Sequence, residues 1–239
     1  MIKQALKKFL PDRPVAARVW RGPFRGACVW MNPRHSLRKM FGLYENELNQ
    51  WLEETLHRVV RVLDVGANDG YFTFGSAAAF RRLRKAGQII AFEAQPQHVA
   101  LLRRSVAAQS CTTTPVHLEV VQAFVGKELK QGMTTLDAVH WTLGDQAERT
   151  NTLIKIDVEG AELDVIEGAR SWLQPSNFFV IEVHREKFLS ELKQIFAVSG
   201  HDLIEIKQRP VPFLGRENRD EKNWWLVSNL QQSRNTLQK

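Results

Sequence analysis

The fold is decided by residues 59–70, VVRVLDVGANDG, which lead directly into Tyr71-Phe-Thr-Phe74. The apolar start predicts a buried strand, the glycines predict a tight turn, and the residues after Gly70 fit a helix. Gly66 and Gly70 lack a Cβ, so a ligand can lie against bare backbone at the start of that helix. We expect Asp64, at the end of the predicted strand, to fix the charge of that ligand.

The spacing of the turn narrows the class of ligand. A dinucleotide-binding fingerprint has a glycine for close approach of a pyrophosphate where this chain has Asn68. A phosphate-binding loop would also need a lysine followed by Ser or Thr, and neither follows here. The turn therefore favours a cation, such as the methionine ammonium of S-adenosylmethionine.

A second acid follows at the expected distance. Glu93 ends the apolar stretch Ile89–Phe92, 23 residues after Gly70. In a strand–helix–strand unit, a carboxylate about 20 residues past the glycine turn accepts ribose hydroxyls. Asp64 and Glu93 could instead be ordinary strand-end acids that cap helices. Their combination with the turn favours a nucleoside pocket, for which the candidates are Asp64, Gly66, Ala67, Asn68, Gly70 and Glu93.

The candidates for chemistry lie further along the chain. Residues 153–162, LIKIDVEGAE, alternate as a strand does and then continue into a helix, so Lys155, Asp157 and Glu159 are expected on one face. Residues 178–184, FFVIEVH, predict a second buried strand, with Glu182 and His184 on a common face. If these strands are parallel neighbours, both sets meet at the carboxyl edge, where open α/β sheets bind ligands.

Five segments, taken in order, resemble the FkbM family of S-adenosylmethionine-dependent methyltransferases. They are Asp64–Gly70, Ala91–Glu93, Thr135–Asp137, Lys155–Glu162 and Ile181–His184. The resemblance covers roughly residues 59–184, and the Lys155–Glu162 block is its most specific part. It implies transfer of a methyl group to a hydroxyl oxygen, often on a sugar or a polyketide. One departure is Ser105, where the family commonly has Asn.

Three residues are candidates for the base that takes the proton of the acceptor. Asp157 is favoured by position and His184 by chemistry, because imidazole titrates nearest neutral pH; Glu159 is the third. Lys155 is also a candidate in the catalytic set, although a structural ion pair with Asp157 or Asp137 is the favoured interpretation.

A metal is not expected. Asp157, Glu159, Glu182 and His184 form an oxygen-rich set with one imidazole, which suits Mg²⁺ or Mn²⁺. The chain has no ligand-spaced motif such as His-x-x-x-His. We therefore predict a metal-independent reaction.

The whole chain is predicted to be an α/β protein of the class I methyltransferase, Rossmann-like type. We expect a seven-stranded, mostly parallel sheet with helices on both faces and a basic N-terminal arm. The predicted boundaries are 1–58 for the arm with an amphipathic helix, 59–230 for the methyltransferase domain and 231–239 for a polar tail. Residues 201–206 and 224–227 predict strands, the latter closing the sheet, and residues 131–151 are a candidate pocket wall.

Charge is unevenly distributed. Residues 1–41 contain ten Lys and Arg against one acid, whereas the rest of the chain contains 23 bases and 25 acids. The arm could bind an acidic glycan or small molecule, a membrane surface or nucleic acid, or it could be a solvated terminus. Four aromatic residues indicate that part of it packs: Trp20, Phe24, Trp30 and Phe41. Nucleic acid is the least expected partner, and oligomeric state is not predicted.

Cysteine usage and hydropathy favour a soluble cytoplasmic protein. Cys28 and Cys111 lie outside any zinc or redox spacing, and no stretch of about 18 apolar residues could span a bilayer. The amphipathic residues 2–10 leave peripheral membrane contact open. The predicted function is that of an S-adenosylmethionine-dependent O-methyltransferase acting on a carbohydrate-like or secondary-metabolite acceptor. The alternatives are a non-catalytic S-adenosylmethionine-binding module and an RNA 2′-O-methyltransferase.

Overall fold

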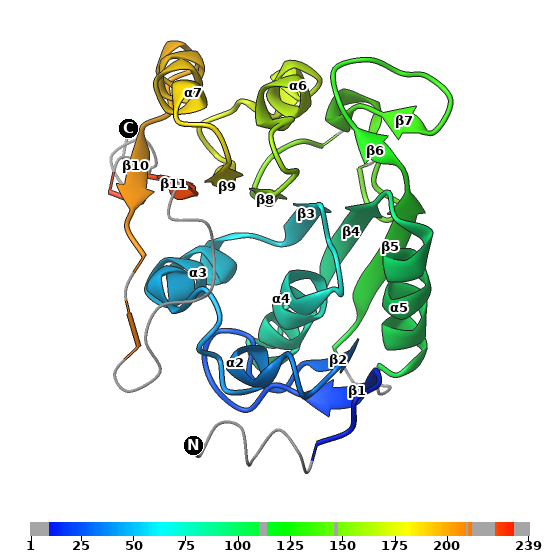
Figure 1. Ribbon diagram of the computed structural model, residues 1–239. Coiled ribbons are helices and arrows are strands. Elements are labelled where there is room, and N and C mark those ends of the chain that lie inside the picture. The colour runs from blue at the N-terminus through cyan, green and yellow to red at the C-terminus, as the bar shows by residue number, and fades with distance from the viewer. Residues whose placement is uncertain (1–9, 110–113, 146–147, 209, 212–222, 232–239) are drawn as a thin grey trace.

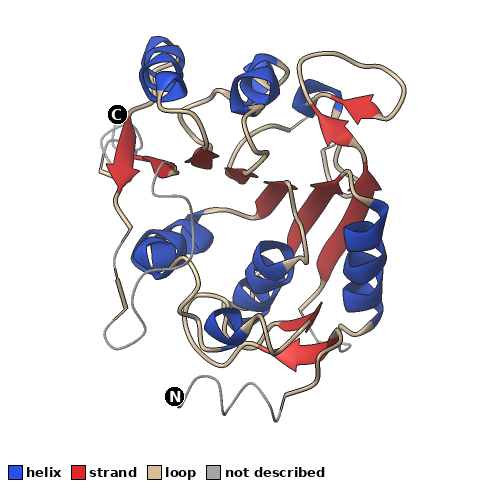
Figure 2. Cartoon of the chain, in the orientation of Figure 1, coloured by secondary structure: helices blue, strands red, loops and turns tan. Residues whose placement is uncertain are grey.

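The computed structural model describes residues 10–109, 114–145, 148–208, 210–211 and 223–231 (Figure 1). A central sheet separates two layers of helices, as the colouring by secondary structure shows (Figure 2). The expected polar tail 231–239, the amphipathic residues 2–10 and Cys111 lie almost entirely outside the described residues.

The elements of the described chain have the following bounds. The strands are β1 (Val15–Arg18), β2 (Cys28–Met31), β3 (Arg61–Val65), β4 (Gly87–Glu93), β5 (Val116–Gln122), β6 (Phe124–Val125), β7 (Met133–Thr134), β8 (Thr152–Ile156), β9 (Phe178–Val183), β10 (Leu203–Ile206) and β11 (Trp224–Ser228). The helices are α2 (Leu37–Met40), α3 (Asn49–Arg58), α4 (Tyr71–Arg82), α5 (Pro96–Ala107), α6 (Glu162–Glu167) and α7 (Lys187–Val198), with 3-10 turns η1 (Asn46–Leu48), η2 (Leu136–Ala138) and η3 (Arg170–Trp172).

The main sheet has seven strands in the order β10-β11-β9-β8-β3-β4-β5, which confirms the predicted fold class. Strands β5, β4, β3, β8 and β9 are parallel neighbours. Every residue of β3, β8 and β9 is buried, as expected for strands covered on both faces. The expectation that residues 224–227 close the sheet is wrong, because β11 lies between β9 and β10, antiparallel to both, and β10 forms the edge.

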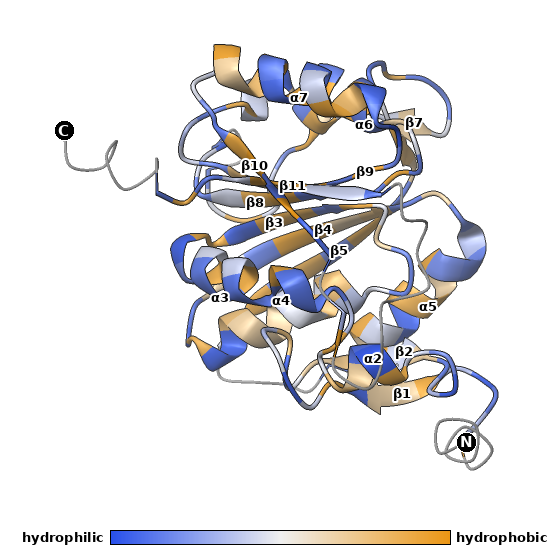
Figure 3. Cartoon of the chain, turned by 60° about the vertical axis from the view of Figure 1, so that its left-hand side comes forward, coloured by the Kyte–Doolittle hydropathy of each residue, from blue (hydrophilic) through white to orange (hydrophobic). Residues whose placement is uncertain are grey.

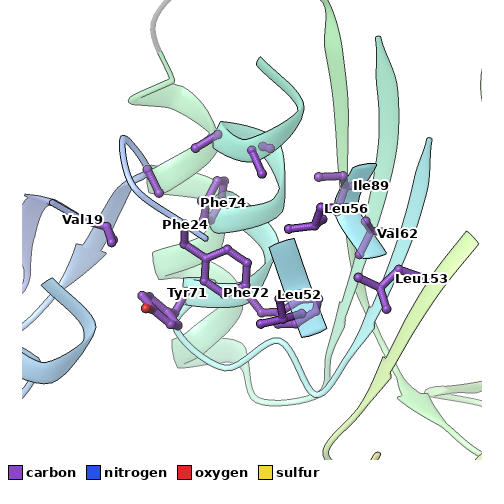
Figure 4. Close-up of a cluster of buried hydrophobic side chains, with 14 of the residues drawn as sticks. Val19, Phe24, Leu52, Leu56, Val62, Tyr71, Phe72, Phe74, Ile89 and Leu153 are labelled. Carbon is purple, nitrogen blue, oxygen red and sulfur yellow. The ribbon is translucent and has the colours of Figure 1, made fainter. Parts of the chain in front are cut away.

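One face of the sheet is covered by α3, α4 and α5 together with the β1–β2 hairpin (Figure 3). The aromatic ring of Phe24 packs edge-on against Tyr71 and Phe72 of α4, within the cluster drawn in Figure 4. Gly75 makes room for it, since a Cβ there would lie 2.2 Å from the Phe24 ring. Part of the predicted arm therefore contributes to the hydrophobic core.

A buried hydroxyl ties the hairpin to the next helix. The Ser105 hydroxyl of α5 accepts a hydrogen bond from the Trp30 backbone N–H of β2 at 2.8 Å. Ser105 therefore has a structural role at the position where the family that the chain resembles commonly has Asn.

The other face is covered by η2, α6, η3 and α7. Trp141, from the predicted pocket wall, is buried edge-on against Trp172 of η3. Leu143 and Gly144 of the same stretch line a cavity of 420 Å³ beside Gly87, at the start of β4. That cavity lies at the amino ends of the parallel strands, so this part of the wall faces away from the predicted site. None of the described helices is long and apolar enough to cross a membrane.

Replacing Phe24 tests whether the N-terminal segment is part of the core. Phe24 is 2% exposed, so Phe24→Ala should lower the free energy of unfolding by about 3–5 kcal/mol, because the truncation leaves a cavity. Phe124→Ala is the matched control, since that ring is 64% exposed, and should change it by less than about 0.5 kcal/mol. Urea denaturation measures both, and equal effects would show that the segment does not pack as described.

Candidate functional site

The register of the sheet brings the ends of four strands to one level. Val65 of β3 pairs with Phe92 of β4 on one side and with Ile156 of β8 on the other. The residues that follow are therefore level as well, which places Gly66 beside Glu93 and Asp157. Because Ile156 also pairs with Ile181 of β9, Glu182 and then His184 follow at the same edge. The strand ends that carry the sequence-predicted residues thus meet at the carboxyl edge of the sheet; Figure 1 shows these strands side by side.

The glycine turn needs its glycines for two physical reasons. Gly66, Asn68 and Gly70 all have positive φ, at 77°, 51° and 85°, which side chains with a Cβ resist. A Cβ on Gly66 would lie 1.9 Å from the backbone oxygen of Asp157. Gly66 therefore allows the turn after β3 to touch the turn after β8.

Asp64 lies beneath the turn and does not face a ligand. Its residue is 0% exposed, and its carboxylate accepts a hydrogen bond from the Thr73 hydroxyl of α4. Burial raises the pKa of Asp64, and the charge of Lys155 together with the Thr73 hydrogen bond partly offsets that increase. The expectation that Asp64 meets the charge of a ligand directly is therefore wrong for this structure; it supports the turn from below.

Lys155 is the buried cation of the site. Its Nζ lies 3.2 Å from Asp157 Oδ2 and 3.5 Å from Asp64 Oδ1, and it donates to the backbone oxygen of Gly66 at 3.0 Å. Burial would lower the pKa of Lys155, but the charges of Asp157, Asp64 and Glu45 raise it above the ordinary value. Lys155 therefore stays protonated near neutral pH. These contacts favour the structural ion pair with Asp157, whereas Asp137 instead accepts a hydrogen bond from Ser171.

Glu93 is held at the end of β4 by two backbone donors. Its Oε2 accepts from the Asn68 N–H and its Oε1 from the Gln95 N–H, both at 2.8 Å. A carboxylate offers about four acceptor positions, so two remain for a ligand. The position fits an acceptor of ribose hydroxyls beside the glycine turn.

His184 is joined to two carboxylates from the β8–α6 segment. Its Nδ1 lies 2.6 Å from Glu162 Oε1, and its Nε2 lies 3.8 Å from Asp157 Oδ1. Burial would lower the pKa of His184, but the hydrogen bond to Glu162 and the charges of Glu182, Asp157 and Glu162 raise it. Burial would raise the pKa of Asp157, but Lys155 lowers it, so Asp157 is ionised near neutral pH.

Glu162 lies beside His184 at the site, whereas Glu159 does not. The strand ends at Ile156, and Glu159 is exposed in a turn with φ of 44°. The expectation that Glu159 shares a face with Lys155 and Asp157 is therefore wrong. Glu162, which is not among the sequence-predicted candidate residues, is fully buried, accepts a hydrogen bond from the Gly160 N–H and contacts His184. The only signal in the sequence for the contact of Glu162 with His184 was its position five residues after Asp157.

The N-terminal segment supplies two groups that sequence reasoning missed. Lys39 of α2 lies 2.6 Å from Asp69 Oδ2 in the glycine turn, with its Nζ 4.8 Å from the centre of the Tyr44 ring. Glu45 is buried and acts through its charge on Lys155. The local basic excess of residues 1–41 was the only sequence signal for the Lys39 contact.

Three side chains have the chemistry of a metal site. One ligand atom from each of Asp157, Glu182 and His184 lies within 4.8 Å of the others. Glu159, the fourth member of the expected set, does not belong to this group. Oxygen ligands with one imidazole suit Mg²⁺ or Mn²⁺. That the reaction is metal-independent stays a prediction.

Comparison with known proteins finds one matching family. The family described as Methyltransferase FkbM domain matches residues 108–206, which include the Lys155–Glu162 block and His184. The chain is similar to that domain over this region. No curated protein matches the chain.

One solved structure, with a TM-score above 0.5, shows a similar fold. The methyltransferase FkbM from Methylobacillus flagellatus KT is 17% identical with a TM-score of 0.52, and the match covers 72% of this chain and 44% of that protein. This chain therefore spans less than half the length of that FkbM protein. A putative methylase from Haemophilus influenzae is 15% identical over 90% of this chain and 99% of its own, with a TM-score of 0.49. The precorrin-6Y C5,15-methyltransferase from Geobacter metallireducens is 16% identical over 75% and 87%, with a TM-score of 0.45.

Replacing Gly66 tests the contact between the turn after β3 and the turn after β8. Gly66→Ala introduces both left-handed strain and a clash with the Asp157 backbone, so affinity for S-adenosylhomocysteine should fall by about ten-fold or more. Gly132→Ala is the control, because Gly132 has φ of 74° with nothing within 4 Å of an added Cβ and incurs only the strain of about 1–2 kcal/mol. Isothermal calorimetry compares both variants, and unchanged affinity in Gly66→Ala would contradict the described turn.

Proposed function

We propose that the protein transfers a methyl group from S-adenosylmethionine to a hydroxyl oxygen of a carbohydrate-like or secondary-metabolite acceptor. The observation that carries the proposal is the His184 imidazole, held by the buried Glu162 at the same sheet edge as the glycine turn. This arrangement places a histidine, whose pKa is raised by neighbouring acids, at the same edge as a turn and a Glu93 carboxylate that suit a nucleoside.

The residues present fit a cationic, adenosine-bearing cofactor. The backbone of Gly66, Ala67, Asn68 and Gly70 would lie against it, and the spare acceptor positions of Glu93 would take its ribose hydroxyls. The acids Asp157 and Glu182, at the ends of adjacent strands, give this edge a negative character that suits a sulfonium and an ammonium. When bound, S-adenosylmethionine supplies the electrophilic methyl group.

His184 is the better base of the two that sequence reasoning left open. Its Nδ1–H donates to the ionised Glu162, which leaves Nε2 as the atom that can accept a proton. Asp157 is a weaker base, because Lys155 lowers its pKa, and its position near Nε2 stabilises the imidazolium that forms. A positioned base of this kind contributes about 10²–10⁴-fold to the rate. The proton of the acceptor hydroxyl thus moves to Nε2 as the oxygen gains the methyl group.

The proposed activity is tested with a labelled cofactor. The full chain is incubated with S-adenosylmethionine labelled in the methyl group and a panel of glycans and hydroxylated secondary metabolites. We expect label in at least one acceptor, with S-adenosylhomocysteine formed in equal amount, and a loss of about 10²–10⁴-fold in the His184→Gln variant. Tight cofactor binding without product across the panel would favour a non-catalytic S-adenosylmethionine-binding module.

The role of Glu162 is tested through the pKa of His184. Glu162→Gln replaces the charged partner with a neutral one, so the pKa of His184 should fall relative to the wild type, whose pKa is raised above the ordinary value of 6.5. Glu167→Gln, an exposed acid on the same helix, should leave it unchanged. NMR titration of the imidazole signals measures this, with the His184 signal assigned by its absence in His184→Gln. Equal shifts in both variants would show that Glu162 does not control the histidine.

A further inference from the structure

A second cavity lies away from the carboxyl edge. It has a volume of 710 Å³ and is bordered by the β1–β2 hairpin, the last turn of α4 and Gln109 after α5. Helix α4 begins at the glycine turn and runs 12 residues, or about 18 Å, before it reaches this cavity. We call it the arginine groove, because Arg18, Arg25, Arg81 and Arg82 line it.

The arginine groove holds more positive charge than its acids neutralise. Glu53 is shared by two of the arginines, with its Oε1 2.6 Å from Arg25 and its Oε2 3.2 Å from Arg82. Arg82 also donates to the backbone oxygens of Pro23 and Arg25, so it has a structural role. Among the residues that the structure describes, neither Arg18 nor Arg81 forms an ion pair.

Arg81 is the most informative of the four. Its Nη1 donates to the neutral Gln109 Oε1 at 2.8 Å, and Gln109 is itself fixed by donating to the backbone oxygens of Cys28 and Ser105. The Nε of Arg81 is buried and has no hydrogen-bond partner in the described structure. Burial lowers the pKa of Arg81 without any carboxylate to offset it, although a guanidinium stays charged in proteins. A positioned, partly desolvated cation without an anion is costly unless an anion binds there.

We propose that the arginine groove binds the phosphoryl group of a phosphorylated ligand. Guanidinium groups present planar donor forks that match phosphate oxygens, and Arg18 and Arg81 are the two groove arginines that no carboxylate of the described structure engages. The volume lies within the range of small-molecule sites, about 300–1,000 Å³, and exceeds what a phosphoryl group alone fills. Trp20, 55% exposed at the rim beside Phe41, offers an aromatic surface to the uncharged remainder.

Stabilisation of arginines at a helix C-terminus accounts for only part of the groove. Arginines in the last turn of a helix are stabilised by its free carbonyl groups, and Arg81 and Arg82 end α4. That effect does not explain why Arg18 and Arg25, from the opposite wall, face the same cavity. The ligand chemistry is compatible with a soluble phosphate ester and with a phospholipid head group, and the experiment separates these sources. The proposal does not depend on methyl transfer, because the groove lies at the other end of α4.

The test measures phosphate binding by the full chain at constant ionic strength. Inorganic pyrophosphate and glycerol 3-phosphate are titrated by calorimetry, and phosphatidylglycerol vesicles are compared with phosphatidylcholine vesicles by sedimentation. We expect binding in one of these arms, weakened about ten-fold or more by Arg81→Gln and by Arg18→Gln, because each removes a charged hydrogen-bond donor. Arg18 is exposed, so its variant tests the groove without disturbing the core.

Three further measurements test whether the phosphorylated probe binds in the arginine groove. Arg170→Gln removes an exposed arginine of η3, on the opposite face of the sheet, and should change the affinity by less than about two-fold. Cys28 lines the groove, so alkylation of its thiol should slow when the phosphorylated probe is bound. Affinity for S-adenosylhomocysteine should be unchanged in the Arg18 variant, which separates this proposal from the proposed function. Absence of binding in all arms, or equal losses in all three arginine variants, would overturn the proposal.

Discussion

The buried Lys155 cation organises the carboxyl edge of the sheet. It stands between the ends of β3 and β8 and contacts a carboxylate from each, together with the backbone oxygen of Gly66. A charge removed from water is tolerated only when partners and hydrogen bonds surround it. Asp64 and Asp157 must therefore stay close to the Lys155 ammonium, and the backbone carbonyl of Gly66 must stay directed at it. The positions of the turn and of Asp157 are thus fixed by one electrostatic requirement.

Other parts of the site follow from that arrangement. With Asp157 held by Lys155, its backbone oxygen occupies the space that a Gly66 side chain would need. The chain then turns through Glu159 and Gly160, both with positive φ, and starts α6 so that Glu162 reaches His184 of the neighbouring strand. The structural ion pair and the carboxylate that holds the candidate base therefore belong to one strand–turn–helix segment of eight residues, Lys155–Glu162. The FkbM-matched region contains this segment, whereas the glycine turn lies outside it.

The order of acids and glycines along the chain was sufficient to predict the sheet and the meeting of its strand ends. Parallel strands with continuous apolar runs have few alternatives, and a carboxylate at each strand end must then lie at the same edge. The sequence could not predict how deeply each of these carboxylates is buried. Asp64 and Glu93 look equivalent in the sequence, yet Asp64 pairs with Ala91 inside the sheet and is fully buried, whereas Glu93 is the last residue of β4 and accepts a hydrogen bond from the backbone of the turn.

The same limit explains Glu159 and the N-terminal segment. Which of two acids in a turn reaches a histidine depends on backbone dihedrals that alternation does not encode, and Glu162 rather than Glu159 does so. Charge counting described residues 1–41 as a basic arm, but Phe24 and Val29 pack into the core and Lys39 reaches the glycine turn. Long-range contacts of this kind carry no local signature.

The most direct test of this account is the calorimetric affinity of Lys155→Met for S-adenosylhomocysteine, measured beside the wild type. The variant keeps the length of the side chain and removes the charge, which leaves Asp64 buried without its cation and releases the Gly66 carbonyl. The account predicts that the wild type binds and that the variant loses about ten-fold or more in affinity, because a buried carboxylate without its cation destabilises the arrangement of the turn. Wild-type affinity in the Lys155→Met variant would contradict it.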